Sequence, residues 1–114
     1  NDYPYGQCTW WAYTRRAQLG LPVGSHFGDA RSWGDSARAL GYWVDNTARH
    51  VGDIVVFAPG QLNADSFYGH DAIVEEVHAD GSIKISESNV KGLGVISDRT
   101  FTAQEASQLT YIHY

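Results

Sequence analysis

The sequence predicts a single α+β domain, with helices in the first third of the chain and an antiparallel sheet in the rest. Helix-compatible residues dominate up to residue 40, whereas short apolar runs separated by turn residues follow Gly41. The 114 residues match the usual size of one domain, about 100–150 residues. We therefore expect residues 1–114 to form one domain. The first residue is not Met, so we also expect this domain to be a piece of a longer, secreted protein.

Two helices are expected before the sheet. The first should cover residues 8–19, because Gly20 is a typical helix stop. The second should cover residues 30–40, with Asp29 as its N-cap. Residues at helical spacing give this second helix one core-facing stripe: Trp33, Ala37 and Leu40.

The remaining elements follow from apolar runs and turn signals. Strands are expected over residues 42–44, 53–58, 70–78, 82–89, 95–101 and 109–114. Asp80-Gly81 should join two of these strands into a hairpin. Thr102 and Glu105 form a capping-box pattern that opens a short helix over residues 103–108.

Charge and composition exclude several classes of partner. Eight Lys and Arg against thirteen Asp and Glu give a net charge of −5, with no basic run, so nucleic acid and anionic membranes are not expected partners. No apolar run reaches the roughly 18 residues of a membrane span. A single cysteine excludes an internal disulfide. We expect a monomer.

The only cysteine, Cys8, lies at the expected start of the first helix, after Gly6-Gln7. A helix N-terminus carries free N–H groups and partial positive charge, which should lower the pKa of the thiol. A thiolate there is a nucleophile, and the N–H groups can hold the oxyanion formed by its attack on a carbonyl. The alternative is a buried cysteine that acts as a small apolar side chain.

A cysteine nucleophile needs a base, and the chain offers five histidines. His70 is the best candidate, because it follows Gly69 and opens an apolar strand next to a loop. The others are His26, His50, His78 and His113. We expect the first two to be solvated in loops, and the last two to lie at strand ends, on the surface or partly hydrogen-bonded.

Glu87 and Asn89 are candidate partners of His70, because they share one face of the return strand with two isoleucines. In an ideal hairpin Asn89 lies nearer to His70, whereas a bulge or a longer turn would favour Glu87. Both assignments stay open at this point, as does the alternative that the two side chains cap the strand end and bind water.

The spacing of potential ligands does not predict a metal site. The chain has no Cys-x-x-Cys pair and no His-x-x-x-His on a helix, which are the usual zinc patterns. Asp2 alone does not make a calcium site. Gly92-x-Gly94 precedes no helix and is typical of a turn, not of a phosphate loop. We therefore expect neither a metal nor a cofactor.

Four segments together resemble the CHAP family, the cysteine- and histidine-dependent amidohydrolases/peptidases. They are YGQCTWWA at 5–12, VGDIVVF at 51–57, GHDAIVEEV at 69–77 and ISESN at 85–89. The resemblance implies a papain-like α+β fold. It also implies that Cys8 is the nucleophile and His70 the general base, with Glu87 in the third catalytic position and Asn89 in an assisting fourth.

The resemblance also extends to the surroundings of the nucleophile. It suggests that Gln7, with the Cys8 N–H, forms the oxyanion site, and that Gln7 and Tyr5 contact the substrate. Asp71 departs from the family, which often has an apolar residue there, and would add negative charge beside the base.

The implied function is hydrolysis of amide bonds in bacterial peptidoglycan by a secreted, wall-directed enzyme. The bond would be either N-acetylmuramoyl–L-alanine or a peptide bond, and a papain-like site slightly favours the peptide bond. Two alternatives are a wall-binding or host-interaction module with little activity, and a thiol-dependent acyltransferase.

Overall fold

The computed structural model describes all 114 residues and confirms the α+β class. It has three α-helices, two 3₁₀ turns and six strands. In chain order they are α1 (Cys8–Gln18), η1 (Ala30–Ser32), α2 (Trp33–Ala39), β1 (Val44–Asp45), β2 (Ile54–Phe57), η2 (Gln61–Asn63), β3 (His70–Val77), β4 (Ile83–Ser88), β5 (Ile96–Phe101), α3 (Ala103–Ala106) and β6 (Thr110–Ile112). None of these helices combines the length and the apolar character that crossing a membrane requires.

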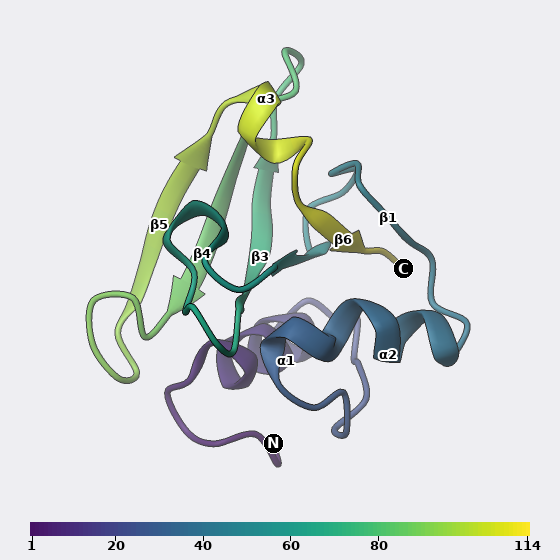
Figure 1. Ribbon diagram of the computed structural model, residues 1–114. Coiled ribbons are helices and arrows are strands. Elements are labelled where there is room, and N and C mark those ends of the chain that lie inside the picture. The colour runs from purple at the N-terminus through teal and green to yellow at the C-terminus, as the bar shows by residue number, and fades with distance from the viewer.

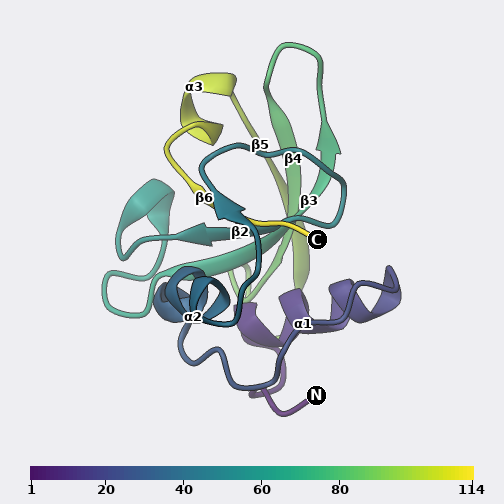
Figure 2. The ribbon, with the colours of Figure 1, turned by 90° about the vertical axis from the view of Figure 1, so that its right-hand side faces the viewer.

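The six strands form one sheet in the order β1-β6-β2-β3-β4-β5, and every neighbouring pair is antiparallel. Helices α1 and α2 lie below the strands in the views of Figures 1 and 2, and α3 lies at the opposite end. The chain therefore brings the start of α1, which comes first in the sequence, against β3 and β4 from its middle.

Two apolar cores lie on the two faces of the central strands, and β2 contributes to both. All four of its residues are buried, which explains why this strand is continuously apolar and does not alternate. On the helix side the core includes Ala12, Trp33, Ile54, Val56 and Ile73. On the other side it includes Val55, Phe57, Val74, Ile85 and Leu109.

The second helix differs from its expected form. It begins as the 3₁₀ turn η1 and becomes α-helical only at Trp33, and the Asp29 side chain makes no capping hydrogen bond. Trp33 and Ala37 are fully buried as expected, but Leu40 is 66% exposed. The expectation for Leu40 is wrong because the helix ends at Ala39 and Leu40 already lies in the C-cap. The capping box of Thr102 and Glu105 is present as expected.

The β3–β4 hairpin contains a bulge that matters for the site. Val77 pairs with Ile83, but the register shifts between Val74 and Glu76, so that Ile73 pairs with Ser86. The extra residue on β3 moves β4 along its partner. Continuing the shifted register beyond Ile73 sets Glu87 opposite Ala72 and Asn89 opposite His70, so both candidate partners lie beside the start of β3.

Candidate active site

A cavity of about 610 Å³ opens where the start of α1 meets the first residues of β3 and the end of β4. Its lining includes the predicted residues Gln7, Cys8, His70 and Asn89. Helix α1 packs on both β3 and β4, so three separate parts of the chain build one site. The fold therefore brings the candidate nucleophile and the candidate base into the same cavity.

Cys8 is the first residue of α1, and the turn before it is tightly fixed. Gly6 has φ +78°, and a side chain there would meet the Gly94 nitrogen at 2.6 Å. The carbonyl of Gly6 accepts hydrogen bonds from Ser88 Oγ at 2.8 Å and from the Gly94 N–H at 3.1 Å. Glycine is therefore required at this position, and its contacts anchor the nucleophile to β4.

The expectation that the helix start lowers the pKa of Cys8 is wrong. Burial, followed by the neighbouring Asp71 carboxyl, raises the pKa of Cys8 to about 12. The backbone N–H groups of Cys8, Thr9 and Asp71 act in the opposite direction but are outweighed. The resting form is consequently a thiol, so a base must take its proton during attack.

His70, the first residue of β3, is almost completely buried, and its side chain is 9% exposed. Gly69 delivers it through a left-handed turn with φ +71°, and a Cβ there would lie 2.5 Å from the Phe57 carbonyl oxygen. The His70 ring lies 5.2 Å from the Phe57 ring. Its Nε2 is 2.8 Å from Glu87 Oε1. This contact orients the imidazole and leaves Nδ1 available on the other side of the ring.

Glu87 is fully buried and is held by two partners. Besides His70, the Arg99 guanidinium contacts both oxygens, with Nε 2.6 Å from Oε2 and Nη2 2.8 Å from Oε1. Burial raises the pKa of Glu87, but the hydrogen bonds from His70 and Arg99 outweigh it and hold this pKa below the usual range. Glu87 is therefore a carboxylate ready to stabilise a protonated His70.

Arg99 was not predicted from the sequence. It pairs with Ile85 across β4 and β5, and it also donates from Nη1 to the Leu62 carbonyl at 2.8 Å. Arg99 comes two positions before the buried Phe101, so the two side chains point to the same face of β5. This spacing could have indicated that the Arg99 side chain points toward the protein interior.

Asn89 makes no hydrogen bond with His70. It follows the end of β4 with φ +70°, a left-handed conformation that asparagine tolerates better than most residues. Its Nδ2 donates to Gln7 Oε1 at 2.9 Å. Glu87, and not Asn89, is therefore the hydrogen-bond partner of His70, and Asn89 instead holds the residue before the nucleophile.

Asp71 is the unusual carboxyl of the site. Its side chain is fully buried, and neither oxygen has a hydrogen-bond partner. Burial raises its pKa well above the usual range, which favours the neutral acid over the carboxylate. Its charge, when present, opposes ionisation of both Cys8 and Tyr3. The sequence suggested negative charge beside His70, whereas the structure places a neutral acid beside Cys8.

Tyr5 does not line the cavity. It is 68% exposed, and its ring packs edge-on against Trp10 with centroids 4.9 Å apart. A role for Tyr5 in binding the substrate therefore stays a prediction from the family resemblance.

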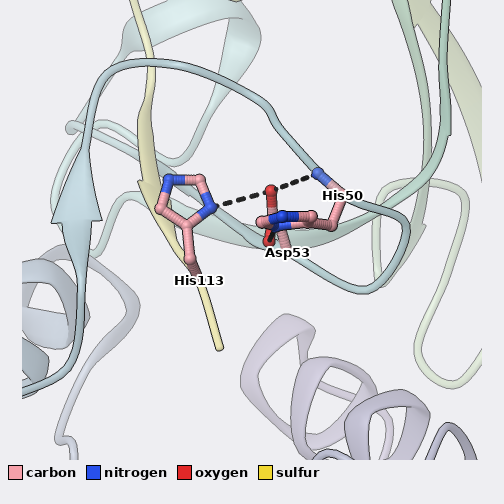
Figure 3. Close-up of side chains that lie close together, drawn as sticks. All are labelled: His50, Asp53 and His113. Carbon is pink, nitrogen blue, oxygen red and sulfur yellow. Dashed lines mark hydrogen bonds and ion pairs between the residues drawn. The ribbon is translucent and has the colours of Figure 1, made fainter.

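The other histidines lie away from this cavity. His26 is exposed, as expected, and His78 is exposed beside Glu76. His113 lies at the end of β6 and is partly hydrogen-bonded, as expected, through Nε2 to Asp45, but it is fully buried, with Asp53 beside Nδ1. His50 is not freely solvated either, because it packs beside the same Asp53 (Figure 3).

Comparisons with known proteins identify the family of this chain. The family model of the CHAP domain matches residues 1–89. The chain belongs to the CHAP family. A solved structure of an N-acetylmuramoyl-L-alanine amidase from Staphylococcus aureus is similar to this CHAP domain with a TM-score of 0.95 and 50% identity, over 99% of the present chain and 32% of that chain.

Relatives of this CHAP domain carry related names. An N-acetylmuramoyl-L-alanine amidase domain-containing protein of Staphylococcus aureus strain NCTC 8325 is 52% identical over 111 residues, which are 96% of this chain and 18% of that protein. Staphylococcal secretory antigen SsaA of the same strain is 39% identical over 114 residues, 99% of this chain and 41% of that protein. This chain therefore spans less than half the length of these relatives.

Proposed function

We propose that this CHAP domain hydrolyses the amide bond between N-acetylmuramic acid and L-alanine in bacterial peptidoglycan. The observation that carries the proposal is the buried contact of 2.8 Å between His70 and Glu87, in a cavity that also holds Cys8. The amidase names of the relatives support this bond over the peptide bond that a papain-like site would favour. The secretory name of another relative supports action outside the cell, on the wall.

The first chemical step would form an acyl-enzyme. His70 Nδ1 takes the proton of the Cys8 thiol while the sulfur attacks the lactyl carbonyl carbon. The resulting imidazolium lies against the Glu87 carboxylate, which stabilises its charge. His70 then gives the proton to the amine of L-alanine, the C–N bond breaks, and the stem peptide leaves. Water, deprotonated by His70, attacks the thioester and releases the muramic acid carboxyl and the free thiol.

Gln7 is suited to the oxyanion site. Its Oε1 accepts from Asn89, so the Nε2 amide protons of Gln7 remain available to the oxyanion, next to the Cys8 N–H. In this proposal Asn89 is a positioning residue that acts through Gln7. In this proposal the domain acts as a monomer.

The test is analysis by mass spectrometry of fragments released from purified cell walls. An amidase releases stem peptides that begin with a free L-alanine amine and carry no muramic acid. Cys8→Ala should lower their release by at least about 10³-fold while the circular dichroism spectrum stays native. Cleaved stems or cross-bridges would instead show an endopeptidase. Binding to walls without any cleavage by the wild-type domain would show the wall-binding alternative.

A further inference from the structure

A second cluster of polar side chains lies at the other end of β2, away from the catalytic cavity. Asp53 directly precedes β2, His113 directly follows β6, and His50 lies in the turn before Asp53. Because β2 and β6 are neighbours in the sheet, these three side chains meet (Figure 3). One ligand atom from each lies within 4.8 Å of the other two.

Each ring nitrogen of His113 faces a carboxylate. Its imidazole is fully buried, and Nε2 lies 2.6 Å from Asp45 Oδ1. This contact places a ring proton on Nε2, because a carboxylate can only accept. In the neutral ring Nδ1 then carries a lone pair, and it faces Asp53 Oδ2 at 2.8 Å. Two electron-rich atoms at this distance repel each other unless a cation is present.

The geometry at Nδ1 of His113 also favours a bound cation. No hydrogen bond of acceptable angle ends on this buried nitrogen, despite the short distance to Asp53. A second proton on the ring would therefore not be well directed at the carboxylate. A buried nitrogen without a well-aligned partner requires an explanation, and a metal ion, which binds the lone pair directly, supplies one.

The two carboxylate oxygens of Asp53 differ in their hydrogen bonds. Its Oδ2 accepts the backbone N–H groups of Arg49 at 2.9 Å and of His50 at 2.8 Å, which fixes the carboxylate. Its Oδ1 has only the His50 Nδ1 nearby, at 3.3 Å. A spacing of about 3.3 Å also separates two ligands of a tetrahedral ion with bonds near 2.0–2.1 Å.

We propose that His50, Asp53 and His113 bind a divalent transition metal, with zinc as the best match. Two imidazole nitrogens and one carboxylate oxygen favour zinc over calcium or magnesium, which prefer oxygen ligands only. The Asp45–His113 contact is the carboxylate–histidine arrangement that orients metal ligands in proteins. The His50 side chain is 39% exposed, so it opens the site to solvent and to a fourth ligand from water.

The bound ion would tie the turn before β2 to the chain end after β6. The chain end is already joined to β1 and to the residue before it, through the Asp45 contact of His113 and through His113 N–H to the Trp43 carbonyl. The ion would therefore stabilise the fold at a distance from Cys8 and would not take part in catalysis. No spacing in the sequence revealed this site, because residues 50 and 113 meet only through sheet pairing.

The test is zinc titration by isothermal calorimetry in a Cys8→Ala background, which removes the thiol as a competing ligand. We expect one zinc per chain. His50→Ala should weaken binding at least tenfold without unfolding the protein, because His50 lies partly in solvent. His78→Ala is the matched control, since His78 is also beside a carboxylate, Glu76 at 2.9 Å, and should leave zinc affinity unchanged.

Two further measurements use the same proteins. Zinc at a hundredfold excess over its Kd should raise the melting temperature by on the order of 10 °C, and His50→Ala should abolish most of that rise. Cobalt(II) in place of zinc should give the visible absorption of a four-coordinate ion. Absence of zinc binding, or equal affinity in His50→Ala and the parent, would overturn the proposal.

Discussion

Glu87 and Asp71 are both fully buried carboxyl groups next to the catalytic pair, yet their pKa values shift in opposite directions. Glu87 lies between His70 and Arg99, which hold its pKa below the usual range. Asp71 has no partner on either oxygen, and burial raises its pKa well above the usual range. Hydrogen-bond partners, and not burial alone, therefore decide whether a carboxyl in this site is ionised.

The two groups act on different members of the pair. Glu87 contacts the His70 ring, whereas Asp71 lies beside Cys8. The base is thus supported by a negative charge that stabilises its protonated form. The nucleophile lies beside a neutral acid that, once ionised, would oppose formation of the thiolate.

The largest expected effect comes from removing the charge on Glu87. Glu87→Gln keeps the shape of the side chain but loses the carboxylate that stabilises protonated His70, so wall hydrolysis should fall about 10²–10⁴-fold. The matched control is Glu75→Gln, which also breaks a contact with an arginine, Arg15 at 2.9 Å, but outside the cavity. Equal rates in the two variants, measured by loss of turbidity of purified walls, would contradict the role of Glu87.

Replacing Asp71 should improve the protein, because it should raise the free energy of unfolding. Asp71→Val removes a buried carboxyl without partners and introduces a β-branched residue suited to a strand, so we expect stabilisation of about 1–3 kcal/mol. Urea denaturation followed by circular dichroism measures the change. Glu76→Val, on the exposed part of the same strand, should change stability by about 0.5 kcal/mol or less. Loss of stability in Asp71→Val would show that the carboxyl has a favourable partner.

The pH dependence of stability should separate the two groups further. Glu87 has a lowered pKa in the folded state, so its stabilising effect is present above about pH 4 and is lost as the pH falls through the folded pKa. Asp71 has a raised pKa, so its cost grows as the pH rises above about 4. The advantage of Asp71→Val over wild type should therefore widen with rising pH, whereas the deficit of Glu87→Gln should narrow in acid. Melting curves from pH 3 to 8 test both trends.

The smallest expected effect belongs to Asn89. Asn89→Ala removes the hydrogen bond that fixes Gln7 Oε1 but leaves the His70–Glu87 contact intact. We expect kcat to fall by a factor on the order of 10 or less, because only the orientation of one oxyanion donor is lost. Gln7→Ala should then make the additional loss of Asn89 almost neutral. A defect in Asn89→Ala as large as that of Glu87→Gln would favour the ideal-hairpin assignment.

Most elements could be predicted because each has a local signal. Gly20, the Thr102 capping box and the apolar run at residues 54–57 act within a few positions of the chain, and all three are confirmed. The predicted burial of Leu40 is wrong, because helical spacing alone does not show at which residue a helix ends.

The features that the sequence missed or left open are non-local. The choice between Glu87 and Asn89 stayed open because it depended on the left-handed turn of Asn89 after β4, which local pattern does not show. The pKa of Cys8 depended on burial and on Asp71, which lies 63 positions away in the chain. Burial of His113 depended on pairing of β6 with β1 and β2.

The most direct test of the account is the position of the proton on the His70 ring, observed by ¹⁵N NMR of the histidine-labelled protein. In neutral His70 we expect a proton on Nε2, hydrogen-bonded to Glu87, and a lone pair on Nδ1 ready for the Cys8 proton. Glu87→Gln should remove this preference, and Asn89→Ala should leave it unchanged. A proton on Nδ1 in the wild-type domain would contradict the assignment of His70 as the base for Cys8.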